Sequence, residues 1–289
     1  MLIPFDWHIH THNSPCGNEQ ATLELIAEEA YAAGMLCIGF SDHIHTGATL
    51  DLIEASRREF DELNPPIQCL FGVEVSVVRD WDIEEDAKKD VPFYRYNDGP
   101  ELPPTILLNE EIMQRFSIEY VIGSTHWLLG ALQDPQAMID SFHRQNVMLA
   151  QHPLVNIIAH PWWHQCPEDG FGGRLMVPWF EDFSVIPEKY HREFADAVVE
   201  NGKAVEISVG FLHKNPLMNE RFRKLYREFL VELRERGVQF TVGGDTHDAG
   251  YDYILDLAQS ELEMLDLTAD DLWRPDGVTI GATKTDAGK

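Results

Sequence analysis

The chain of 289 residues is poor in basic residues, because 22 Lys and Arg stand against 49 Asp and Glu, a formal net charge of −27 with the histidines neutral. Contact with nucleic-acid phosphates or with an anionic membrane needs a basic surface, so neither is expected as the main partner. No run of about 18 apolar residues is present. The start MLIPFDWHIH lacks the basic and apolar regions of a signal peptide. We therefore expect a cytoplasmic protein without a membrane segment.

Cysteine is scarce as well. The four cysteines, at positions 16, 37, 69 and 166, show no C-x-x-C spacing. Cys37 and Cys69 lie inside apolar runs, as is typical of reduced thiols in a protein core. The sequence thus predicts no disulfide framework, and its 44% of hydrophobic residues is ordinary for a globular protein.

Short apolar runs alternate with amphipathic stretches along the chain. Several runs are apolar on both faces, which is typical of strands buried in a parallel sheet. We predict a helix over 22–33 that Gly34 ends, and a helix that opens at Asn215 and ends at Gly237. The alternation favours βαβ units in a distorted (β/α)7 TIM-like barrel, with a single domain over 1–289. The seven runs are 3–9, 36–41, 67–75, 119–124, 155–159, 203–208 and 238–243.

Two stretches depart from this repeat. Residues 77–104 are rich in proline, tyrosine and tryptophan, and residues 161–182 are rich in tryptophan and glycine. Long loops in a compact domain are usually functional or disordered, and the aromatic residues favour order. We therefore predict two ordered loop insertions there.

Every predicted strand is followed by a residue type that binds metals. Taken singly, each has a structural explanation; Asp42, for example, suits a helix cap. The carboxyl ends of parallel barrel strands meet on one face, however, so the whole set would converge on one cavity. Imidazoles and carboxylates without a dominant thiolate suit Zn, Mn or Fe, and two such ions favour hydrolysis at phosphorus. The set comprises His8, His10, Asp42, His43, Glu74, His126, His160, Glu206, Asp245 and His247.

These residues occur in motifs that resemble those of the PHP superfamily, named for polymerase and histidinol phosphatase. The motifs are DWHIHTHNSPCG (6–17), FSDHIH (40–45), FGVEV (71–75), GSTHW (123–127), IAHP (158–161), VEIS (205–208) and GGDTHD (243–248). The resemblance implies a distorted (β/α)7 barrel, a site for two or three metals and phosphoester hydrolysis. The stretches EYVIGSTHWLLG and EISVGFLHKNP are similar to the histidinol-phosphatase branch, whereas IAHPWW departs from it.

The resemblance also implies which residues bind two or three divalent ions, expected to be Zn, Mn or Fe. Cys16 stands where the family usually has Asp or His, which implies a third site that is altered, weak or absent. The implied ligands are His8, His10, Glu74 and Asp245 for one ion, Glu74, His126 and His160 for a second, and Cys16, His43 and His247 for a third.

The predicted activity is hydrolysis of a small phosphorylated metabolite, similar to histidinol phosphate, by a metal-bound hydroxide. Asp42, Asp245 and His247 are the candidate catalytic residues, with Asp42 or Asp245 handling protons. A phosphate group also needs cations, although each basic residue taken singly is equally compatible with a surface role. The candidates for substrate binding are Arg79, Arg174, His164, His213 and Lys214.

The sequence is also compatible with three other functions. An amidohydrolase-type barrel that acts on a lactone or cyclic amide also has H-x-H after its first strand. Such barrels commonly bridge their metals with a modified lysine at a strand end, and no lysine stands at such a position in this sequence. A nuclease or polymerase-associated domain conflicts with the charge of −27. A non-catalytic metal-binding module would keep the ligands without hydrolysis.

Overall fold

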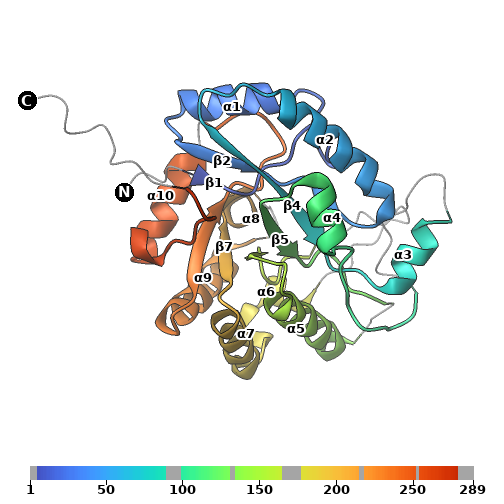
Figure 1. Cartoon of the computed structure of the whole chain (residues 1–289). Coiled ribbons are helices and arrows are strands. Elements are labelled where there is room, and N and C mark those ends of the chain that lie inside the picture. The colour runs from blue at the N-terminus through green and yellow to red at the C-terminus, as the bar shows by residue number, and fades with distance from the viewer. Residues whose placement is uncertain are drawn as a thin grey trace, which may run out of the picture.

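The strands of the computed structural model lie side by side in a parallel sheet that is nearly closed into a barrel (Figure 1). The structure describes residues 5–88, 99–130, 134–164, 177–214, 218–251 and 254–278. Within these residues the order of the sheet is β1-β2-β4-β5-β6-β7-β8, and the short β3 pairs with β4. The strands are β1 (Phe5–Asp6), β2 (Cys37–Phe40), β3 (His43–Ile44), β4 (Gln68–Ser76), β5 (Tyr120–Ser124), β6 (Ile157–Ala159), β7 (Ala204–Ser208) and β8 (Gln239–Gly243).

The segments that follow β1 and β8 meet and bring the barrel close to closure. Ile9 and Thr246 form a parallel bridge, and the amide of His10 donates to the carbonyl of Thr246 at 2.8 Å. The amide of Gly244 donates to both carboxylate oxygens of Asp6, at 3.0 and 3.1 Å. These contacts bring together the first of the sequence motifs, at 6–17, and the last, at 243–248.

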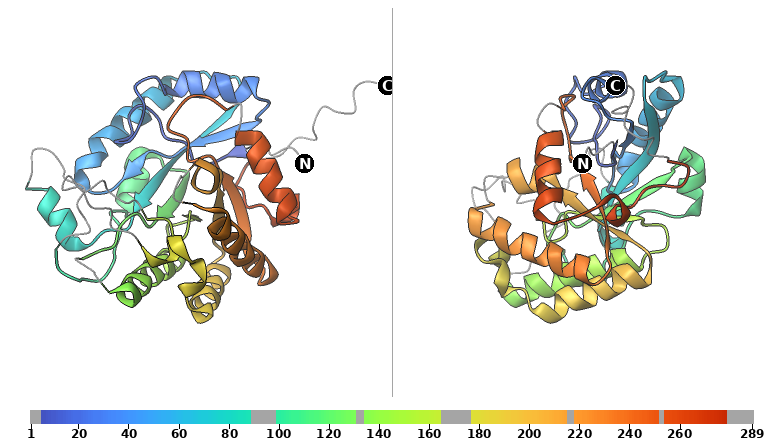
Figure 2. Two further views of the ribbon diagram at one scale, coloured as in Figure 1. Left: turned by 180° about the vertical axis from the view of Figure 1, so that it is seen from behind. Right: turned by 90° about the vertical axis from the view of Figure 1, so that its left-hand side faces the viewer.

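Helices surround the strands in every view (Figures 1 and 2). Each long helix packs its apolar stripe on the outside of the sheet, so that the barrel wall is buried on both faces. The helices are α1 (Leu23–Ala32), α2 (Leu50–Glu62), α3 (Asp80–Asp86), α4 (Glu110–Phe116), α5 (Pro135–Gln151), α6 (Pro178–Glu181), α7 (Glu188–Glu200), α8 (Val209–Lys214), α9 (Glu220–Glu235) and α10 (Ile254–Met264).

A buried tyrosine fills the barrel beneath the strand ends. The hydroxyl of Tyr120 donates to the carbonyls of Trp7, at 2.6 Å, and Phe40, at 3.2 Å. A Cβ atom at Gly39 or Gly72 would overlap the Tyr120 side chain, so both positions require glycine. The two glycines therefore make room for a ring that ties β1, β2 and β5 together.

The predicted fold class is confirmed, and all seven predicted strands are present. The predicted helix over 22–33 is α1, which Thr22 caps by accepting from the amide of Leu25. Gly34 follows it with φ of 91°. The predicted start of the later helix at Asn215 is wrong in that α9 begins at Glu220, because the Asn219 side chain caps it. Positions 215–217 lie outside the described residues.

The two predicted insertions are described in part. The first contains α3, and the second contains α6, while positions 89–98 and 165–176 lie outside the described residues. The single domain over 1–289 stays a prediction. Cys16, Cys37 and Cys69 are free thiols, and Cys166 lies outside the described residues. Among the described helices, none is both long and apolar enough to cross a bilayer.

Candidate metal centre

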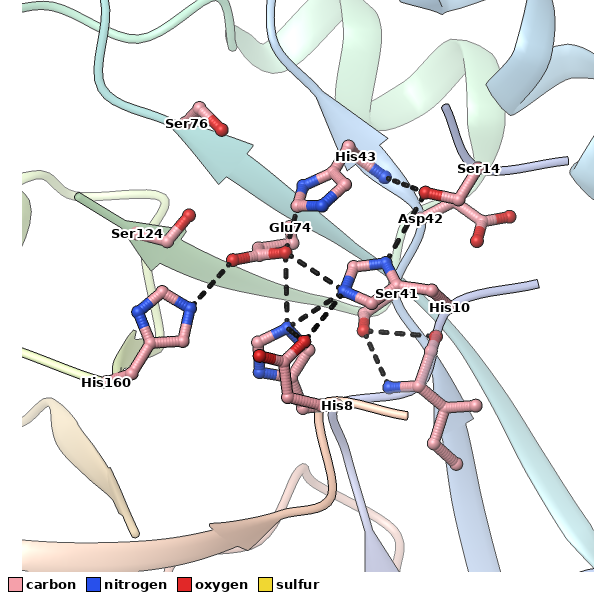
Figure 3. Close-up of polar contacts among 12 residues, drawn as sticks. His8, His10, Ser14, Ser41, Asp42, His43, Glu74, Ser76, Ser124 and His160 are labelled. Carbon is pink, nitrogen blue, oxygen red and sulfur yellow. Dashed lines mark hydrogen bonds and ion pairs between the residues drawn. The ribbon is translucent and has the colours of Figure 1, made fainter. Parts of the chain in front are cut away.

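Glu74 lies at the centre of a ring of imidazoles at the carboxyl ends of the strands (Figure 3). The side chain projects from β4 and is fully buried. The nearest imidazole nitrogens come from four different strand ends. Oε2 of Glu74 lies 3.1 Å from His8 Nε2, 3.2 Å from His10 Nε2 and 2.9 Å from His43 Nδ1, and Oε1 lies 3.3 Å from both His126 Nε2 and His160 Nε2.

The surroundings of Glu74 suit a carboxylate that bridges two cations. Neither of its oxygens makes a well-formed hydrogen bond to any described residue, although both are buried. Burial alone would raise the pKa of Glu74, but the imidazoles of His43 and His8 outweigh it and hold the pKa well below its usual range. A buried carboxylate of this kind needs positive charge around it. The donor set therefore fits divalent metal ions.

Two groups of ligand atoms flank Glu74. His8, His10 and Asp245 form one group, and Glu74 itself forms the other with His126 and His160; in each, the ligand atoms lie within 4.8 Å of one another. Oδ1 of Asp245 lies 3.5 Å from His8 Nε2 and 3.3 Å from His10 Nε2. The structure thus brings together the residues that the motifs imply for the first two ions.

A third group lies on the other side of His10. Its four members, His10, Cys16, His43 and His247, also place their ligand atoms within 4.8 Å of one another. Burial lowers the pKa of His43 to about 3, so this imidazole is neutral and able to bind a metal. Cys16 therefore lies where a third cation would be bound, as the motifs imply.

Two residues of the site have strained backbone. His160 has φ of 27° and Asp245 has φ of 47°, in the left-handed region that is unusual for residues other than glycine. Trp162, close to His160 in the chain, has φ of 71°. Such conformations persist where the surrounding structure holds them, and they concentrate at functional sites. The strain at two separate candidate ligands supports a functional role for this strand-end cluster.

Glu206 orients one of the ligands from behind. Its Oε1 lies 2.6 Å from His8 Nδ1, and its Oε2 accepts from the amide of His160 at 3.1 Å. A Cβ atom at Gly243 would overlap Oε1 of Glu206, so glycine leaves the space that the carboxylate occupies. The sequence marked Glu206 as a ligand type at a strand end, but only the structure shows that it contacts His8.

His45 and Ser76 are further site residues that the motifs did not single out. Ser76 Oγ lies 2.8 Å from His45 Nδ1 and 2.7 Å from His126 Nδ1. His45 packs on His43, with the ring centroids 4.5 Å apart. The signal in the sequence was the second H-x-H pair, His43 and His45, in the motif FSDHIH.

Asp42 lies beside the centre with its carboxylate engaged. Oδ1 accepts from the amide of Thr11 at 2.7 Å, and Oδ2 accepts from the hydroxyls of Thr11, at 2.7 Å, and Ser56. These three donors favour a role in holding the loop after β1 against α2. The catalytic assignment of Asp42 stays a prediction.

Two of the predicted substrate-binding residues, Arg79 and His213, have acidic partners inside the protein. The buried guanidinium of Arg79 donates to both oxygens of Asp82, at 2.7 and 2.6 Å, and to the carbonyl of Pro100. His213 Nε2 lies 2.6 Å from Glu261 Oε1, a carboxylate that also binds Arg227. These contacts tie neighbouring segments together.

The structure describes the other three predicted substrate-binding residues to different extents. His164 is buried, and its Nδ1 lies 3.1 Å from the carbonyl of His126. The backbone of Lys214 ends α8, and Arg174 lies outside the described residues. Binding of substrate by all five stays a prediction.

Solved structures with the same fold include two phosphatases. The histidinol phosphate phosphatase of Lactococcus lactis, determined with zinc, L-histidinol and phosphate, aligns with a TM-score of 0.54 and 18% identity over 93% of this chain and 95% of its own. The putative histidinol phosphatase of Listeria monocytogenes aligns with a TM-score of 0.58 and 12% identity over 86% and 98%. At these identities the likeness concerns the fold.

Sequence comparison places the chain in a family. A probable phosphatase of Acetivibrio thermocellus is 24% identical over 241 residues, which are 82% of this chain and 78% of that protein. The model of the PHP domain matches residues 6–243. That range holds all of the strands apart from Phe5, the first residue of β1, and all of the candidate ligands except Asp245 and His247, which lie just beyond it. The chain belongs to the PHP domain family.

Proposed function

We propose that this protein is a metal-dependent phosphatase that hydrolyses a small phosphomonoester. The proposal rests mainly on the buried Glu74 carboxylate, which lies between two groups of imidazoles. The probable phosphatase of Acetivibrio thermocellus and the phosphate-bound structure from Lactococcus lactis support the reaction class. Histidinol phosphate is the first substrate to test, because the latter protein was determined with L-histidinol and phosphate.

The proposed cofactor is two or three divalent ions, Zn, Mn or Fe. Such ions, when bound, polarise the phosphoryl oxygens and lower the pKa of water. The proposed ligands are those brought together at the strand ends: His8, His10, Glu74 and Asp245 for one ion, Glu74, His126 and His160 for another, and Cys16, His43 and His247 for a third.

Asp245 is the proposed proton acceptor. Burial alone would raise the pKa of Asp245, but the charge of His8 and the hydrogen bond from His10 hold it well below its usual range. The ionised carboxylate therefore suits a cation, and its exposure, not its pKa, supports the role as proton acceptor. Its side chain is 16% exposed, whereas that of Glu74 is fully buried, so Asp245 is accessible to water. His247 is proposed to act beside it, with Nδ1 held 3.1 Å from the carbonyl of Asp245.

Release of inorganic phosphate from a panel of phosphomonoesters, with the metal content of the protein measured in parallel, tests this function. His126→Ala should abolish metal-dependent release, because it removes a ligand that lies against Glu74. His143→Ala is the matched control, since that imidazole packs on Tyr190 and contacts Glu193 on the outside of the barrel. Full activity in His126→Ala, or in metal-free protein, would contradict the proposal.

A further inference from the structure

Ser76 lies between two imidazoles at the mouth of the barrel. Its hydroxyl oxygen is 2.7 Å from His126 Nδ1 and 2.8 Å from His45 Nδ1. All three side chains are buried, so hydrogen bonds inside the protein must satisfy their polar atoms, and Ser76 is the close partner of both imidazole nitrogens. The three residues come from β4 and from the segments that follow β3 and β5.

The arrangement follows from strand register. His43 pairs with Glu74 and Ile44 pairs with Val75, so His45, the next residue after β3, lies beside Ser76 in the same register. Side chains alternate along strands, and the two histidines of the H-x-H pair therefore face the same side as Glu74 and Ser76. His43 joins the layer of Glu74, and His45 joins the layer of Ser76, one step nearer the mouth.

The hydrogen bonds have a defined direction when His126 binds a cation. Nε2 of His126 faces Glu74, so a cation at that nitrogen leaves the ring proton on Nδ1. Nδ1 then donates to the oxygen of Ser76, whose single hydroxyl proton is left to donate to Nδ1 of His45. The hydroxyl of Ser76 thus accepts from His126 and donates to His45.

We propose that Ser76 and His45 are positioning residues that orient His126 toward the cation shared with Glu74 and His160. The proposal rests on the metal centre of the proposed function, but not on its phosphatase chemistry. Partners behind a metal-binding histidine fix its tautomer and ring orientation. Without the hydroxyl, the Nδ1 proton of His126 would lose its close partner inside the protein.

Ser124 provides a comparison within the same site. Its hydroxyl lies 3.4 Å from His126 Nδ1, and it donates to the carbonyl of Val75 at 3.3 Å. The Ser124 hydroxyl is thus farther from His126 Nδ1 than the Ser76 hydroxyl is, and the Ser124 hydroxyl proton has the carbonyl of Val75 as its acceptor. Removal of the Ser124 hydroxyl should therefore affect metal binding much less than removal of the Ser76 hydroxyl.

The test measures zinc affinity by competition with a chelator, with zinc content after dialysis as a second readout. Ser76→Val and Ser76→Thr have nearly the same shape, and only threonine keeps the hydroxyl. Loss of a partner behind a metal ligand typically weakens binding about 10- to 100-fold, so we expect that loss in Ser76→Val for the zinc that His126 binds. Ser76→Thr and Ser124→Ala should stay close to the unmodified protein. His45→Phe, which keeps a ring beside His43, should weaken binding in the same direction.

Equal zinc affinity in Ser76→Val and Ser76→Thr would overturn the proposal, and so would unmodified protein that binds no zinc. If Ser76→Val does not fold, Ser76→Ala takes its place in the comparison with Ser76→Thr, because alanine removes the hydroxyl without adding atoms. Protein that binds zinc with the expected pattern but releases no phosphate from any ester would contradict the proposed function and leave the positioning role supported. The two failures are thus distinguishable.

Discussion

Nδ1 of His8 lies 2.6 Å from Oε1 of Glu206, which joins the end of β1 to β7 across 198 positions of the sequence. The opposite nitrogen of the same ring, Nε2, lies 3.1 Å from Glu74 Oε2. One imidazole thus has a carboxylate on each side. This is the arrangement that fixes the orientation of a metal-binding histidine and raises its basicity.

Glu206→Gln should weaken zinc binding about 10- to 100-fold, because the amide keeps the shape of the side chain but not its charge. Chelator competition measures the change. Glu193→Gln is the matched control, since Glu193 contacts His143 Nε2 at 2.7 Å and its side chain is 57% exposed. Equal affinities in the two variants would show that Glu206 has no such role.

Gly243→Ala should destabilise the protein by about 1–3 kcal/mol, the usual cost of overfilling a packed site. The added Cβ would overlap Oε1 of Glu206 and would lie 2.8 Å from Cβ of His8. Urea unfolding measures the free energy, and zinc affinity should fall with it. Gly47→Ala is the control, because a Cβ there meets no atom within 4 Å. An unchanged free energy of unfolding in Gly243→Ala would contradict the packing argument.

Cys16→Ser should remove sulfur from the third group of ligands. Cobalt bound beside the thiolate of Cys16 is expected to show sulfur-to-metal charge-transfer absorption, and the serine variant should lose that absorption. Cys69→Ser is the control, because Cys69 lies near the start of β4, far along the strand from the ligands. Absorption that persists in Cys16→Ser would show that another group binds the cobalt.

Zinc binding should release protons at neutral pH. Burial alone would lower the pKa of His8, but Glu206 and Glu74 raise it well above its usual value, and Cys16 and Asp245 act in the same direction on His10. Both rings thus hold protons that zinc must displace, so affinity should fall as the pH falls, by about tenfold per pH unit for each proton released.

Calorimetric titration in two buffers with different enthalpies of ionisation measures this proton release. Glu206→Gln should release fewer protons than the unmodified protein, because the variant lacks the charge that raises the pKa of His8. Identical heats in both buffers would contradict the expected coupling.

Much of the fold was predictable from the sequence because its signals are local. Each apolar run that became a strand is buried over most of its length, and a residue of a type that binds metals lies at or just after each predicted strand end. The alternation of strand and helix then restricts the architecture to parallel units whose carboxyl ends share one face. The helix predicted from Asn215 begins later, at Glu220, because the Asn219 side chain accepts from the amide of Phe222.

The sequence by itself determined which residue types reach the mouth of the barrel, since strand ends and side-chain alternation are properties of short segments. Only the tertiary structure decided what each one contacts. Glu206 contacts His8, Ser76 contacts His126, and Asp42 accepts from Thr11 and Ser56. The reason is physical: these pairs join segments far apart in the chain, and barrel closure and strand register, not local spacing, bring their atoms within hydrogen-bonding distance.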